Sequence, residues 1–215
     1  MFGGSTDWLS FAVSSAAFLI YEGWVLWVGR RHPERMARYA HARMRAGWAD
    51  ALSTRPGFEI VAVQTLRNSL MSATIGASTA ALALMGTITL AGGTVVESIS
   101  QIRSDGAISL RPVLEGLLML ALFASYVCSA MAMRYFNHAG FVMSLPVESE
   151  QRKPLEPLAR DYVERAGLLY SWGLRFFLMV APLVAGIVNP SLMPVMTAGL
   201  IFVMWYFDRP ARLPA

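Results

Sequence analysis

Five long apolar stretches constrain the fold of this 215-residue chain more than any other feature. About 20 helical residues cross a hydrocarbon core of ~30 Å, and a slightly shorter helix suffices where the membrane thins. A water-soluble domain of this size does not need so much continuous apolar helix. We therefore expect an all-α fold, a polytopic transmembrane helix bundle that forms a single integral membrane domain over residues 1–215. The stretches cover residues 8–29, 69–92, 113–133, 168–188 and 191–207.

The composition supports the same fold class. Hydrophobic residues make up 55% of the chain and charged residues only 15%, whereas about a quarter of an average soluble protein is charged. The net charge is +4, and the basic residues concentrate in two loops, which indicates anionic lipid headgroups as their partner and not nucleic acid. The single cysteine, Cys128, lies within the third stretch, where a lone thiol is a small packing residue and cannot form an internal disulfide or a zinc site.

Arginines are unequally distributed between the two sides of the expected membrane. Residues 1–7 carry none, and the loop after the second stretch carries only Arg103 and Arg111. Positively charged loops mark the cytoplasmic side. We therefore expect an inner-membrane protein with its N-terminus outside, its C-terminus in the cytoplasm and an odd number of crossings. The arginines between the first two stretches are Arg30, Arg31, Arg35, Arg38, Arg43, Arg45, Arg55 and Arg67.

The last apolar region, 168–207, can form either one long kinked helix or two short ones. The sequence Asn189-Pro190-Ser191 is a strong turn signal, because Pro190 lacks the helical N–H and disfavours helix at the residue before it. An odd number of crossings requires two helices here. We therefore expect four to five spans in all, with a hairpin of two short helices at the end.

The longer loops have patterns of their own. Large and small apolar residues recur at every fourth position in 33–52, which predicts a basic amphipathic helix lying in the headgroup layer on the cytoplasmic side. Residues 155–167 predict a shorter interfacial helix, and 92–111, with Gly92, Gly93 and Gly106, predicts a flexible outer connection. The residues expected to contact lipid headgroups are Arg35, Arg38, Arg45 and Trp48.

The second span is unusually rich in small side chains. Small residues let two helix backbones approach closely, which drives association in lipid. The expected helix-packing residues are Ser69, Ala73, Gly76, Ala77 and Ala81. Hydroxyls on the same span leave a second interpretation open, a pore-lining helix, although membrane serines and threonines commonly bond to their own backbone.

Polar side chains also gather toward the expected cytoplasmic ends of the spans. An ionisable residue inside a span is costly and is a candidate for function, so we expect Glu22 to pair with Arg175 or Arg67. We also expect the polar residues of spans two and three to come together. Two interpretations stay open: charges that hold the bundle together, and a vestibule for an ion or substrate. The set is Glu22, Gln64, Arg67, Asn68, Arg134, Asn137, His138 and Arg175.

Sequence motifs that carry enzyme chemistry are missing. The chain has no Walker loop, no G-x-G-x-x-G, no H-E-x-x-H and no G-x-S-x-G. His138 is the only histidine near a span, and one histidine cannot supply a bis-histidine haem site. We therefore expect no catalytic activity, no cofactor and no metal centre.

Two motifs give the chain a resemblance to a known family. Residues 62–74 read A-V-Q-T-L-R-N-S-L-M-S-A-T, and residues 134–137 read R-Y-F-N, with tyrosine at a slot that is usually phenylalanine. They resemble the signatures of a family of bacterial and plant membrane proteins catalogued as domain of unknown function 599. The resemblance extends over nearly the whole chain, to a closing Tyr206-Phe207-Asp208. The family has no established activity, so the resemblance implies the membrane fold and the importance of Gln64, Arg67, Asn68 and Asn137.

The sequence thus leads to two functional hypotheses. The first is a non-enzymatic integral membrane protein that acts as a helix-packing subunit of a homo-oligomer or of a larger membrane complex. The alternative is a small-ion channel or transporter with a polar cytoplasmic vestibule. A channel requires a continuous water-accessible path, whereas a packing subunit requires a broad lateral contact.

Overall fold

The computed structural model describes residues 4–32, 36–105 and 109–209. Across these ranges the chain forms helices and connecting turns and contains no strand, as the sequence predicts. Two 3-10 turns, Lys153–Leu155 and Pro190–Leu192, precede α5 and α7. The α-helices are α1 (Ser5–Arg31), α2 (Ala37–Ser53), α3 (Glu59–Asp105), α4 (Leu110–Met143), α5 (Glu156–Leu178), α6 (Val180–Val188) and α7 (Met193–Asp208).

Five segments within the described ranges are long and apolar enough to cross a membrane, so the chain is a multi-pass membrane protein. The last two form the expected hairpin. After α6 ends, the Asn189 side chain accepts a hydrogen bond from the backbone N–H of Ser191 at 3.0 Å, and a proline stands in the first turn of α7. The segments are Ser5–Arg31, Glu59–Thr94, Leu110–Met143, Lys153–Val188 and Pro190–Asp208.

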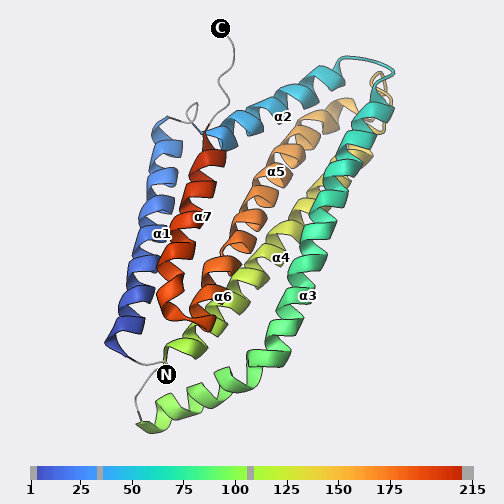
Figure 1. Ribbon diagram of the computed structural model, residues 1–215. Helices are drawn as coiled ribbons and strands as arrows, with labels where there is room; N and C mark the ends of the chain where they lie inside the picture. The colour runs from blue at the N-terminus through green and yellow to red at the C-terminus, as the bar shows by residue number, and fades with distance from the viewer. Residues whose placement is uncertain (1–3, 33–35, 106–108, 210–215) are drawn as a thin grey trace.

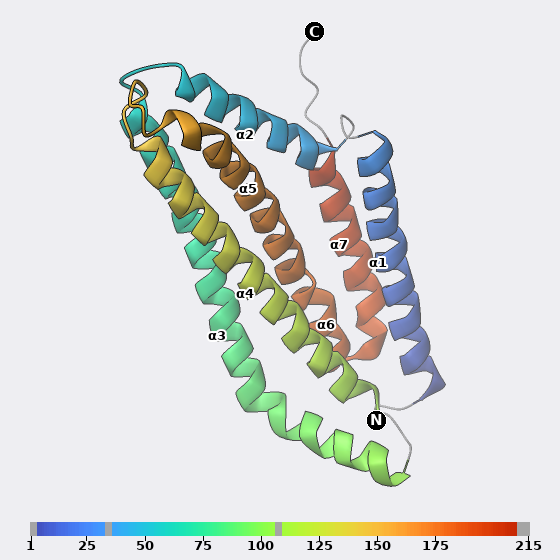
Figure 2. The ribbon, with the colours of Figure 1, turned by 180° about the vertical axis from the view of Figure 1, so that it is seen from behind.

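The spanning helices lie side by side in the order α3, α4, α5 with α6, α7 and α1 (Figures 1 and 2). α3 packs mainly on α4, and α1 packs mainly on α7, so α3 and α1 are the two edges of the bundle. α2 crosses the end at which α1 and α7 finish and packs along the first part of α5 (Figure 1). We call this the basic end, because Arg30, Arg31 and Arg38 lie there.

Small residues allow the closest packing in the bundle. Ala73 of α3, Ala132 of α4 and Ala166 of α5 are fully buried in one apolar cluster, which also contains Leu66 and Phe136. Backbones approach closely at such positions. In lipid, where the hydrophobic effect does not bring helices together, this close van der Waals packing stabilises their association. The face of α3 expected to pack is therefore directed at α4.

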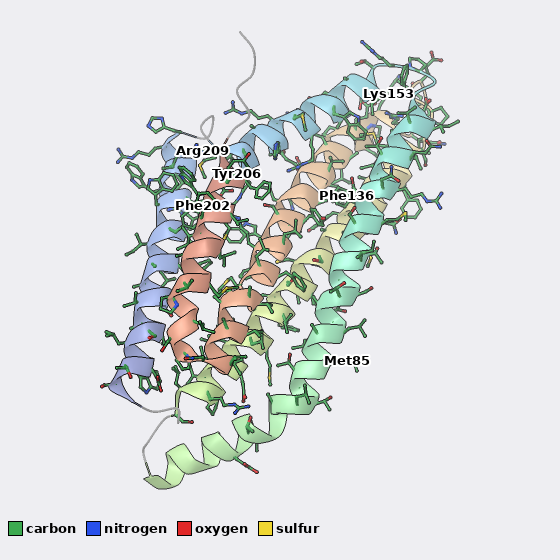
Figure 3. The ribbon with its side chains drawn as sticks, viewed as in Figure 1. Met85, Phe136, Lys153, Phe202, Tyr206 and Arg209 are labelled. Carbon is green, nitrogen blue, oxygen red and sulfur yellow. The ribbon has the colours of Figure 1, made fainter. Side chains whose placement is uncertain are left out.

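Two of the expected loop structures are corrected. The outer connection at 92–111 is helical as far as Asp105, because α3 continues, bends near Met85 and runs across the end opposite the basic end (Figures 1 and 3). A glycine such as Gly92 or Gly93 destabilises a helix by about 1 kcal/mol relative to alanine. Backbone N–H and C=O groups left unpaired in an apolar surrounding would cost more free energy than this, so the helix continues. Gly106 lies outside the described residues. The short helix expected at 155–167 is the beginning of α5, which runs without a break to Leu178.

Candidate functional site

Buried charges of opposite sign meet between α1, α5 and α7 near the basic end. Arg175 donates from Nη1 to Glu22 Oε1 at 2.6 Å and from Nη2 to the carboxylate of Asp208. Tyr21 donates its hydroxyl to Asp208 Oδ2 at 2.7 Å. Of the two expected pairs the structure forms Glu22 with Arg175. We call these four residues the charge cluster.

The charge cluster is well shielded from solvent. The side chains of Arg175, Glu22 and Asp208 are 8%, 13% and 14% exposed. Glu22 lies eight residues before Arg30, or about 12 Å along the helix axis at ~1.5 Å per residue. A membrane boundary at Arg30 therefore places the charge cluster inside the hydrocarbon layer, where each charge needs a partner.

Sequence reasoning missed the roles of Asp208 and Tyr21. Asp208 is the last residue of α7, and a carboxylate at a helix end is ordinarily solvated. The signal that could have placed it is helical phase. Asp208 follows the buried residues Leu200 and Met204 at intervals of four, so it continues their inward face.

A cavity of about 330 Å³ adjoins the charge cluster between α2, α5 and α7. Arg38 and His41 of α2, Arg175 of α5 and Asp208 of α7 line it. Figure 3 shows Tyr206 and Arg209 at this end of α7. The cavity therefore has a basic wall that α2 supplies and a wall of hydrogen-bonded charges that the charge cluster supplies.

Arg38 lines this cavity and forms no ion pair with another described residue. Its residue is only 9% exposed, and its guanidinium carbon lies 4.7 Å from the centroid of the Trp172 ring. The Nε and Nη2 atoms are buried, and neither has a hydrogen-bond partner in the described part of the chain. Burial lowers the pKa of Arg38, and the nearby positive charge of Arg175 acts in the same direction.

Three residues of α2 that were expected to contact lipid headgroups turn toward the bundle, and the headgroup contact itself stays a prediction. Arg38 and Arg45 turn inward, Trp48 packs against the apolar cluster of α3, α4 and α5, and Arg35 lies outside the described residues. The reason is that α2 packs through alanines, which bring it close enough to α5 for the Arg45 guanidinium to lie over Gly167. The buried alanines are Ala37, Ala42, Ala46 and Ala49.

The remaining polar residues face outward. Arg134 and His138 of α4 share a surface hollow with Tyr162 of α5, and the His138 and Tyr162 rings are 5.9 Å apart. Among the described residues, none of α3 lines that hollow. Apolar residues such as Leu66 and Phe136 pack between α3 and α4, so the polar residues of these two helices lie on the surface of the bundle and not in its interior. The exposed members are Gln64, Arg67, Asn68, Arg134, Asn137 and His138.

Six hydroxyls of α3 donate to backbone carbonyls of the same helix. Thr65 donates to the carbonyl of Val61 at 2.9 Å, and Ser72 donates to that of Asn68 at 3.1 Å. The same arrangement holds Ser69, Thr74, Thr87 and Thr89. These hydrogen bonds give no support to a pore lined by α3. Among the described residues, no group of three or more His, Cys, Asp or Glu side chains is placed to hold a metal ion.

Comparison with known proteins gives one match. Residues 9–212 match the model of the family described as "Protein of unknown function, DUF599". No curated protein and no solved structure matches the chain. The match spans the charge cluster, the cavity, the last four membrane-spanning segments and the first one from residue 9 onward.

Proposed function

We propose that this chain, which belongs to the DUF599 family of proteins of unknown function, is a non-enzymatic helix-packing subunit that pairs with a second copy through the outer face of α3. The position of α3 supports this role. α3 is an edge helix with α4 as its main neighbour, and it is the least buried of the five spans. The side of α3 that points away from α4 is therefore open to a lateral partner.

One observation carries the proposal. Small residues recur at every seventh position on the outward face of α3 up to its bend, and each of them is exposed: Thr65, Ser72, Thr79 and Gly86. A seven-residue repeat keeps one seam of a helix facing a partner helix. Small residues on that seam let the two backbones approach closely.

The flanks of this seam fit the same role. Ile75, Leu82 and Met85 are large, apolar and exposed beside the small residues, so they can pack around a close crossing. Asn68 is exposed near the end of the seam, where a polar amide can bond to its counterpart for about 0.6–2 kcal/mol.

Symmetry decides the geometry of the pair. Two copies inserted in the same direction are related by a two-fold axis perpendicular to the membrane, and such an interface uses the same patch on both copies. α3 then runs parallel to its counterpart, so that Thr79 faces Thr79 and Gly86 faces Gly86. The proposal therefore predicts homotypic contacts along the seam.

The decisive variant is Gly86→Leu. A Cβ at Gly86 would meet nothing within 4 Å inside the protomer, so the substitution should obstruct only the pairing surface. The matched control is Gly23→Leu on α1, where a Cβ also meets nothing within 4 Å. Mass measurement in mild detergent should give a dimer for the wild type and Gly23→Leu, and a monomer for Gly86→Leu. A monomeric wild type would refute the proposal.

The second candidate is a small-ion channel or transporter with its vestibule at the basic end. The cavity beside Arg38 and Arg175 favours it. It is tested by ion flux into liposomes that contain the purified protein, with Arg67→Ala and Arg38→Gln as variants. Flux above background that either variant alters would support a channel, and background flux would leave the packing subunit as the function.

A further inference from the structure

We propose that the cavity between α2, α5 and α7 binds the phosphate headgroup of an anionic phospholipid from the leaflet at the basic end. This inference is independent of pairing through α3, because the cavity and the outer face of α3 have no residue in common.

The first argument is that two buried donors of Arg38 have no acceptor. Arg38 and Arg175 together match Glu22 and Asp208 in charge, but the hydrogen bonds of these carboxylates go to Arg175. Arg38 faces the same cavity with two buried N–H donor atoms, Nε and Nη2, that have no partner in the described ranges. A buried guanidinium without an acceptor is costly. A bound anion would supply that acceptor.

The second argument is the chemistry of the other walls. Leu174, Leu178, Val203 and Phe207 line the same cavity and are exposed on the outside of the bundle. A basic head with apolar flanks fits an amphiphile whose acidic group lies at Arg38 and whose chains lie along α5 and α7. A free inorganic anion would gain no favourable contact with the apolar walls.

The third argument is position. Arg38 lies at the membrane end where Arg30 and Arg31 close α1. Basic pockets between membrane helices at such an end bind acidic headgroups. Trp172 holds the Arg38 guanidinium by a cation–π contact, so the donor is positioned before the lipid arrives.

The test is lipid binding to the intact protein in mild detergent, followed by native mass spectrometry. The probes are phosphatidylglycerol, which is anionic, and phosphatidylcholine, which is zwitterionic. The wild type should retain phosphatidylglycerol in preference to phosphatidylcholine. Arg38→Gln should reduce retained phosphatidylglycerol about tenfold, as expected when charge-assisted hydrogen bonds are lost. The matched control is Arg43→Gln, an exposed arginine on the same helix, which should bind like the wild type.

A second variant separates binding from folding. Val203→Trp fills the apolar side of the cavity without touching a charge, so it should also reduce phosphatidylglycerol binding while the protein still purifies and melts as a folded chain. Arg38→Lys should bind more phosphatidylglycerol than Arg38→Gln but less than the wild type. Lysine keeps the positive charge, but it lacks the planar guanidinium that can donate two parallel hydrogen bonds to a phosphate.

Three results would overturn the inference. The first is equal retention of the two lipids by the wild type. The second is full displacement of phosphatidylglycerol by millimolar inorganic phosphate, which would assign the cavity to a free anion. The third concerns Glu22, whose Oε2 also has no partner within the described residues. If Arg38→Gln lowers the melting temperature equally in both lipids, Arg38 serves an internal pair with Glu22 and not a lipid.

Discussion

Removing Arg175 tests whether the charge cluster holds the bundle together. Arg175→Met would leave the carboxylates of Glu22 and Asp208 side by side without a cation. Breaking a buried ion pair by removing one partner costs ~3–5 kcal/mol. Tyr21 still donates to Asp208 in the variant, and it satisfies part of one carboxylate. We therefore expect a loss near the lower end, about 3 kcal/mol, in the free energy of unfolding.

A surface pair provides the reference. Arg160 Nη1 lies 3.3 Å from Asp50 Oδ2, and these side chains are 50% and 53% exposed. Ion pairs of this kind contribute at most about 1 kcal/mol, so Arg160→Met should change the unfolding free energy little. The measurement is equilibrium unfolding in mixed micelles of mild detergent and dodecyl sulfate, followed by circular dichroism.

A triple variant completes the experiment. Glu22→Gln, Arg175→Met and Asp208→Asn together remove every charge of the cluster, and replacing a whole buried ion network is often neutral or stabilising. The triple variant should therefore be more stable than Arg175→Met alone. The reasoning is refuted if Arg175→Met costs no more than Arg160→Met, or if the triple variant is the least stable of all.

Three further predictions concern packing and topology. Gly173→Ala should cost about 1–3 kcal/mol, because its Cβ would lie 2.7 Å from a hydroxyl of α4. Thermal unfolding measures the loss, and Gly116→Ala, whose Cβ meets nothing within 4 Å, should not lower the melting temperature. Ala77→Leu should overpack the contact between α3 and α4 and also cost about 1–3 kcal/mol, and a variant that melts like wild type would contradict this. Single cysteines at Ser5 and Arg209, with the native cysteine removed, should react with an impermeant reagent from opposite sides of the membrane, whereas reaction from the same side contradicts five crossings.

The sequence was sufficient for the spans and for the need of an arginine partner at Glu22. Apolar length alone predicts a membrane crossing, because the thickness of the bilayer sets the length of the helix. The cost of an isolated charge in lipid predicts that Glu22 pairs with an arginine, but the sequence left Arg175 and Arg67 both open, and the structure forms the pair with Arg175. Asp208 was missed because helical phase shows only that it shares a face with Leu200 and Met204, whereas the packing of α7 against α1 decides that this face is buried.

The orientation of α2 shows a second limit of prediction from the sequence. Its larger apolar residues predicted the face directed at the membrane, but Met44 points outward and is 66% exposed. Alanines face α5 instead, because close approach of two helices requires small side chains. Arg38 and Arg45 then lie on the inward face. Which face of a helix packs is decided by the shape of its neighbour, and hydrophobicity along one helix does not report that shape.

The order in which the charge cluster is completed has a consequence for biogenesis. Glu22 enters with the first span, and the guanidinium that neutralises it follows 153 residues later. Asp208 then follows 33 residues after Arg175, as the last residue of the final helix. The hydrogen-bond network of the cluster is complete only when α7 has inserted to its end, because Asp208 accepts from both Arg175 and Tyr21. A chain that stops at Phe207 leaves these two donors without that acceptor and should accordingly be degraded faster in cells than the 215-residue chain, and equal half-lives in a pulse-chase experiment would show that the completed network is not sensed.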